Sequence, residues 1–306
     1  MNGVLRWLWD AIAEPVLNAL DLRETTKEGH RQWWAPTGLL TFLPLHAAGH
    51  HEERDRDGAR PVLDRVVSSY TPTLRALREA RRLNARVDRS RIGCVVALPD
   101  CGVPWISALP AVENELEMLT GRFPGIEVLR GLDATPERVR EAIQRHGWIH
   151  FACHGVSHRD DPSAGALLLH RGNPLTVTDI AAMDTNGVGL AFLSACDTVR
   201  GGLKLADESI HLASAFLLAR FPQVVGTLWP LVDKSPLSSP TTPTWCRQRN
   251  PYTSIWRGFR LRAQSYPAPT VHVPRSTFCV GGIDAHRCLM CRDPASFAAG
   301  QPRRRV

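Results

Sequence analysis

The chain of 306 residues is 43% hydrophobic, enough to bury one large core or two modest ones. No stretch reaches the roughly 20 consecutive apolar residues of a membrane-spanning helix, so we expect no membrane partner. The net charge of +7 lies at the end of the chain: residues 236–306 hold 11 arginines and two aspartates, whereas residues 1–235 hold 26 basic and 28 acidic residues. This near-neutral balance in residues 1–235 disfavours nucleic-acid binding by the folded part.

Composition divides the chain into three segments. Residues 1–31 are an N-terminal extension with a helical apolar pattern, and its acidic Asp10 and Glu14 do not fit the apolar stretch of a signal peptide. Residues 32–235 are predicted to form the folded domain. Residues 236–306 hold nine of the 23 prolines, so we expect an irregular, largely disordered tail. With eight cysteines and no secretion signal, the expected location is the reducing cytoplasm.

Helices and strands are predicted to alternate along the folded domain. Thr135 is a suitable N-cap, and Pro136 suits the first turn of the helix that follows. The alternation predicts an α/β fold with a mostly parallel sheet and helices on both faces. In chain order we expect helices at residues 4–20, 73–83, 111–122, 136–146, 177–183 and 207–220, and strands at residues 92–98, 127–129 and 224–228.

Two further apolar runs predict strands that end in reactive side chains. WIHFACHG (residues 148–155) ends in His154 and Gly155, and VGLAFLSACDT (residues 188–198) contains Cys196 near its end. Such runs are typical of interior strands of a parallel sheet, and ligand sites form at the carboxyl ends of these strands. A thiolate is a strong nucleophile, and a neighbouring imidazole can take the thiol proton. The two runs therefore predict a nucleophilic site at one edge of the sheet.

Several other blocks accompany these two in order along the chain. They are WWAPTGLLTFLPLHAAG (residues 33–49), VVSSYTPTL (residues 66–74), ALLLH (residues 166–170) and the stretch from LADES to PLVD (residues 205–233). Together with HFACHG and AFLSACDT, they resemble the CHAT domain, a caspase-like cysteine peptidase module related to separase. The resemblance covers residues 32–233 and implies a caspase-like sheet. It also implies a catalytic dyad of His154 and Cys196, which lie 42 residues apart, close to the spacing of caspases, although the caspase pentapeptide is absent.

The resemblance implies that the domain cleaves peptide bonds through an acyl-enzyme. Cys196 would attack the carbonyl carbon, and His154 would pass the thiol proton to the leaving amine. The backbone N–H groups of Gly155 and Cys196 are the candidate oxyanion donors.

Substrate preference gives a further set of candidate residues. Related caspase-like peptidases often prefer a basic residue before the cut, and Asp197, Asp207 and Glu208 are candidate acids for such a pocket. Asp207 and Glu208 also suit the first turn of the helix predicted at residues 207–220, because acidic side chains interact favourably with the positive end of a helix dipole. One residue can do both.

Structural interpretations of the same side chains remain open. Free cysteine is often a small buried hydrophobe, so Cys196 alone would also fit a core position. Cys153 is expected to point to the opposite face of its strand and to pack in the core. His150 and His158 are expected to be solvated or structural.

Two sets of residues contain zinc-ligand types. The set of Cys153, His154, His158 and Cys196 is disfavoured because adjacent strand residues point apart. The tail residues Cys279, His286, Cys288 and Cys291 contain a single Cys-x-x-Cys, which is a weak zinc signal. We therefore expect neither a metal nor a cofactor.

Two functions follow. The first is a CHAT-type cysteine endopeptidase with polypeptide substrates. The second is a catalytically inactive interaction or regulatory module of the same fold, truncated or aberrant at its C-terminus, and a regulatory protein partner fits either. The second function is suggested by the chain after Asp233, where CHAT sequences normally continue with a helix and a late strand. Neither is recognisable here, and residues 270–273 come closest to a strand.

Overall fold

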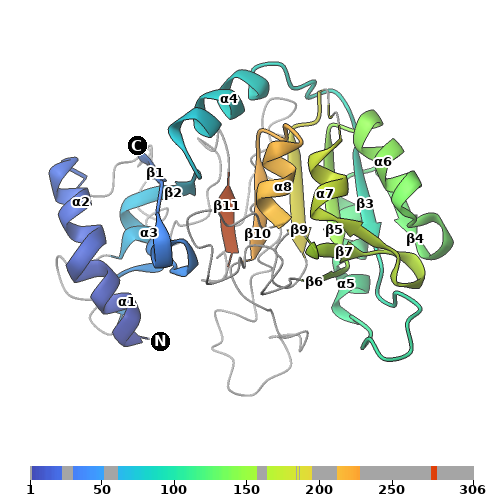
Figure 1. The fold of residues 1–306 in the computed structure, drawn as a ribbon, viewed down its shortest axis with the longest axis horizontal. Coiled ribbons are helices and arrows are strands. Elements are labelled where there is room, and N and C mark those ends of the chain that lie inside the picture. The colour runs from blue at the N-terminus through green and yellow to red at the C-terminus, as the bar shows by residue number, and fades with distance from the viewer. Residues whose placement is uncertain are drawn as a thin grey trace, which may run out of the picture.

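A central sheet of eight strands organises the molecule (Figure 1). The computed structural model describes residues 2–22, 30–51, 61–156, 164–183, 185, 187–194, 212–227 and 277–280. The strands lie side by side in the order β1-β2-β11-β10-β9-β5-β3-β4, and β10 with β11 is the antiparallel pair. The predicted α/β fold with a mostly parallel sheet is confirmed. The strands are β1 (His30–Trp34), β2 (Val66–Tyr70), β3 (Gly93–Ala97), β4 (Glu127–Arg130), β5 (Trp148–Ala152), β9 (Leu190–Ser194), β10 (Val224–Thr227) and β11 (Thr277–Val280).

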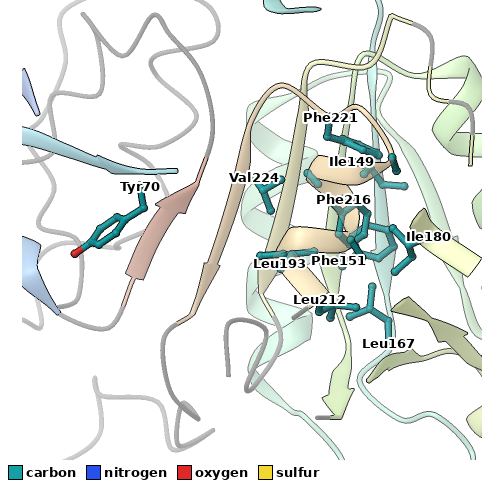
Figure 2. Packing of buried hydrophobic residues seen from close by; sticks show 14 of the residues in the cluster. Tyr70, Ile149, Phe151, Leu167, Ile180, Leu193, Leu212, Phe216, Phe221 and Val224 are labelled. Carbon is teal, nitrogen blue, oxygen red and sulfur yellow. The ribbon is translucent and has the colours of Figure 1, made fainter. Parts of the chain in front are cut away.

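Helices pack against both faces of the sheet. On one face, α6 (Pro136–Arg145), α7 (Val177–Ala181) and α8 (Leu212–Leu218) share the larger apolar cluster with alternate strand residues. Figure 2 shows Phe151 and Leu193 of neighbouring strands in this cluster with Phe216 of α8, and the rings of Phe151 and Phe216 lie 5.4 Å apart. On the other face, α5 (Ala111–Arg122) contributes to the smaller cluster. Alternation of side chains along each strand sends one set to each cluster.

The N-terminal segment belongs to the same core. It forms α1 (Asn2–Leu8), a π-helical turn (Trp9–Ala13) and α2 (Glu14–Ala19). Leu5, Leu8 and Leu17 are fully buried, so the predicted packing helix is confirmed. The other helical elements are α3 (Val62–Arg65), α4 (Leu74–Asn84) and the 3-10 turns Gly38–Phe42, Leu45–Ala47, Gly131–Asp133 and His170–Gly172.

Local capping explains where several helices begin. The Thr135 side chain accepts the N–H of Arg138, and Pro136 stands in the first turn of α6, as predicted. Thr176 and Asp179 form a reciprocal capping box at the start of α7. The helix predicted at residues 111–122 has those bounds, and the residues before Leu212 in the helix predicted from residue 207 lie outside the described residues.

The sequence did not predict several short strands. A separate antiparallel sheet of β6 (His154–Val156), β7 (Ala166–Leu168) and β8 (Pro174–Thr176) follows β5. In the tail, β11 begins four residues after the end of the segment 270–273 and enters the central sheet between β10 and β2. The expected disorder elsewhere in residues 236–306 falls outside the described residues. None of the helices in the described part of the chain has the length and hydropathy to span a bilayer.

Candidate active site

The direction in which successive strands are added reverses between β3 and β5. From β3 the chain moves outward to β4, returns to β5 on the other side of β3, and continues to β9 and β10. Open α/β sheets form ligand sites at the carboxyl ends of the strands at such a reversal, here the ends of β3 and β5. His154 follows β5 at this position, and residues 98–110 form the loop that follows β3.

The His154 side chain is fixed by this loop. Its Nε2 lies 2.8 Å from the carbonyl oxygen of Ser107, and the ring is half-buried. Because a carbonyl oxygen only accepts hydrogen bonds, Nε2 carries the proton and donates it. In the neutral ring, Nδ1 is then the nitrogen with a basic lone pair. Nδ1 is therefore the ring nitrogen that can accept a proton.

Gly155 lies beside His154 in β6 and is half-buried. It is paired with Leu167 of β7, and His154 is paired with Leu168. This short antiparallel pairing fixes the backbone at His154 and in the two residues that follow it. His154 and Gly155 are therefore both held by the pairing of β6 with β7.

β5 and β9 are directly paired in parallel register. Trp148 pairs with Leu190, His150 with Phe192, and Ala152 with Ser194. Ser194 is the last described residue of β9, and Cys196, Asp197, Asp207 and Glu208 lie outside the described residues, as do His158, His286, Cys288 and Cys291.

A polar network that the sequence did not predict lies between α5 and the strands β5 and β9. Glu115 of α5 accepts hydrogen bonds from Nε2 of His150, at 2.8 Å, and from the hydroxyl of Ser194, at 3.0 Å. His150 is fully buried and stacks on Phe192, with ring centroids 4.6 Å apart. One signal was available: Glu115 falls between Val112 and Leu119 on the buried stripe of the helix. Of the two interpretations of His150, the structural one is confirmed.

Three described cysteines are buried. Cys153 belongs to the larger apolar cluster, on the face away from α5, so the prediction that it packs in the core is confirmed. Burial raises the pKa of the Cys153 thiol to about 12, and it also raises the pKa of Cys94 to about 12. Both thiols are therefore protonated at neutral pH and are poor nucleophiles. Across the residues that the structure describes, no three His, Cys, Asp or Glu side chains gather as a metal site would require.

Solved structures resemble the chain at low sequence identity. Two crystal structures of the separase–securin complex of Saccharomyces cerevisiae match with TM-scores of 0.43 and 0.46, at 15% and 11% identity, over 63% and 78% of this chain. The complex of the pro- and mature domains of RgpB from Porphyromonas gingivalis matches with a TM-score of 0.39 and 11% identity over 67% of this chain. The matches cover 11% and 15% of the separase chains and 47% of the RgpB chain.

Sequence comparison identifies the family. No curated protein matches the chain. The pattern that defines the CHAT domain matches residues 2–238, which include the N-terminal helices and every described strand except β11. The caspase-like α/β sheet expected of this domain is the sheet described above. The chain belongs to the CHAT domain family.

Proposed function

We propose that this CHAT domain is a cysteine endopeptidase in which His154 is the base and Cys196 is the nucleophile. The observation that carries the proposal is the register of β5 with β9, in which Ala152 pairs with Ser194. His154 follows Ala152 by two residues, and Cys196 follows Ser194 by two residues, so both lie shortly after paired strand ends in the sequence. Neighbouring strands lie about 4.8 Å apart, so side chains that follow two paired strand ends at the same spacing can come within hydrogen-bonding distance. The match to the CHAT family over residues 2–238 supports the same assignment.

The hydrogen bond from His154 to the loop after β3 supports its role as the base. In the proposed reaction, Nδ1 of His154 takes the proton of Cys196, and the thiolate attacks the carbonyl carbon of a peptide bond. The backbone N–H groups of Gly155 and Cys196 stabilise the resulting oxyanion. The imidazolium then protonates the leaving amine, and the C–N bond breaks to leave a thioester. Water then gives a proton to Nδ1 and attacks the thioester carbon, the C–S bond breaks to release the acid product, and the imidazolium returns the proton to the Cys196 sulfur.

The Ser107 carbonyl performs a supporting role in this scheme. It accepts the Nε2–H of His154 at 2.8 Å and so fixes both the tautomer and the ring orientation. Because the carbonyl oxygen is the negative end of a dipole, it also stabilises the imidazolium that forms when Nδ1 accepts the proton. No side-chain carboxylate is then required to orient the base.

The substrate class is a polypeptide, and a regulatory protein partner is part of the same proposal. Asp197, Asp207 and Glu208 follow the proposed nucleophile in sequence and are the proposed acids of a pocket for a basic side chain. The cytoplasm is the proposed location. A panel of peptides that differ in the residue before the cut tests the pocket, and a preference for arginine or lysine that is lost in Asp197→Asn is expected if this acid contributes.

Thiol labelling with iodoacetamide tests the dyad without knowledge of the substrate. An ordinary thiol is only a few per cent ionised at pH 7. A Cys196 thiolate paired with His154 should therefore react with iodoacetamide on the order of ten-fold faster than an ordinary thiol. The His154→Ala variant should lose this advantage. His50→Ala is the control, because His50 is a partly exposed histidine whose Nε2 is bonded to Asp10, 2.6 Å away. Slow, uniform labelling of all eight cysteines in the folded protein would contradict the dyad and favour the inactive module.

A further inference from the structure

We propose that Glu115 is a positioning residue for the dyad, because its buried carboxylate joins the two strands that lead to His154 and Cys196. The proposal rests on the proposed function. It adds Glu115, which lies far from His154 and Cys196 in the sequence. Its helix, α5, lies between β3 and β4 in the chain and is adjacent in sequence to neither β5 nor β9.

The carboxylate makes one hydrogen bond to each strand. Oε1 accepts from Nε2 of His150 on β5, and Oε2 accepts from the hydroxyl of Ser194 on β9. The side chains of His150 and Glu115 are 0% and 6% exposed, so both side chains are buried. Hydrogen bonds to an ionised carboxylate are stronger than those between neutral groups. Glu115 therefore holds β5 and β9 together from the face that α5 covers.

The bonded residues lie close to the proposed dyad along each strand. Ser194 is two residues before Cys196, and His150 is four residues before His154. A serine side chain turns between rotamers unless a partner holds it, and here the carboxylate fixes it at the end of β9. We infer that this bond sets the direction in which the chain leaves β9 toward Cys196. The precision matters because a displacement of about 1 Å between reacting groups can cost about a hundred-fold in rate.

The same helix and its preceding loop also orient His154. Ser107, eight residues before Glu115, accepts the hydrogen bond of the His154 ring, and the N–H of Leu109 donates to the carbonyl of Pro99 at 2.6 Å. One continuous segment, residues 99–122, thus contacts the proposed base directly and the strand of the proposed nucleophile through Ser194. Movement of α5 would displace both partners of the dyad together.

Packing alone does not require a carboxylate at this position. Val112 and Leu119 on the same helix face contribute to the apolar cluster under α5. When both partners of a buried hydrogen bond are replaced by apolar groups of the same shape, stability is often little changed. A charged group that accepts from both strands provides defined geometry, which an apolar side chain would not provide.

The test measures how fast iodoacetamide labels Cys196 between about pH 5 and 9 in Glu115→Gln, which keeps the shape but removes the charge and replaces one acceptor oxygen with an amide N–H₂ group. We expect labelling at neutral pH to fall about ten-fold and the midpoint of the pH profile to move toward that of an ordinary thiol. Glu117→Gln on the same helix is the matched control, because Glu117 is exposed, and its profile should stay within about two-fold of the wild type.

A second variant separates positioning from folding. Ser194→Ala removes only the hydroxyl that meets Oε2, so it tests the link to β9 even if Glu115→Gln does not fold. We expect slower labelling in Ser194→Ala and no additional loss when it is combined with Glu115→Gln, because both changes act on the same bond. A labelling profile equal to that of the wild type in either folded variant, with a lower unfolding midpoint, would overturn the positioning role and leave the dyad intact. If Cys196 in the wild type is not labelled rapidly, or if its rapid labelling does not depend on His154, the proposed function itself is rejected.

Discussion

Gly93 of β3 pairs directly with Trp148 of β5, and the indole ring lies over the glycine. A Cβ atom built at position 93 would overlap ring atoms of Trp148. The ring cannot easily move aside, because it is 6% exposed and makes an edge contact with Phe123 at 5.1 Å between centroids. Glycine at this position therefore allows two adjacent central strands to pair beneath a large aromatic side chain.

Gly93→Ala should destabilise the protein by about 1–3 kcal/mol, because the added methyl group overpacks the core. Gly121→Ala is the matched control. Gly121 lies in the last turn of α5 with nothing near its missing Cβ, so alanine there should stabilise by about 0.5–1 kcal/mol. Urea unfolding measures both changes. Equal effects of the two substitutions would contradict the packing described for Trp148.

The buried thiol of Cys153 should make stability depend on pH under alkaline conditions. Burial is the largest cause that raises its pKa to about 12, and the charges of Cys101 and Glu115 add to the effect. In the unfolded chain a thiol ionises near pH 8.5. The contribution of Cys153 to stability is thus fully present below this pH and is lost as the pH rises toward about 12, because only the unfolded state releases the proton.

Cys153→Ala should therefore reduce the slope of the unfolding free energy against pH above about pH 8.5, at some cost in stability at neutral pH. Chemical unfolding at several alkaline pH values measures the slope. In the wild type, iodoacetamide should label Cys153 only after urea unfolds the chain. Fast labelling in the folded protein would show that this thiol is accessible.

The capping box at the start of α7 should contribute to stability near neutral pH. The hydroxyl of Thr176 is the main cause that holds the pKa of Asp179 below its ordinary value, and Arg140 lowers it further. Because the folded-state pKa is lowered, this stability is present above about pH 4, where the unfolded carboxyl is ionised. It is lost as the pH falls through the lower pKa of the folded state.

Asp179→Asn should lower the urea midpoint at pH 7 and reduce the further loss of stability below about pH 4. The expected effect is modest, since the carboxylate is 35% exposed. Glu137→Gln is the control, because Glu137 also faces Arg140, at 3.6 Å, but is 73% exposed and makes no cap. A Glu137→Gln effect as large as that of Asp179→Asn would assign the stabilisation to the ion pair and not to the cap.

Patterns that are local in sequence predicted most of the central elements. The apolar runs at residues 148–155 and 188–198 contain β5 and β9, and the bounds of α5 agree with the pattern at residues 111–122. These predictions succeed because an interior strand and an amphipathic helix each show their burial in their own residues. Strand β11 has only four residues, and its partners β10 and β2 are distant in the chain, so its own pattern gave no signal.

The sequence by itself determined the fold class, the family motifs and the candidate pair His154 and Cys196, because apolar periodicity and reactive residue types are properties of short segments. Only the tertiary structure decided that β5 and β9 are paired in register and that Ser107 orients His154. It also decided that Glu115 joins His150 to Ser194. These relationships depend on how separate segments meet in space, and no local pattern specifies the partner of a buried polar group.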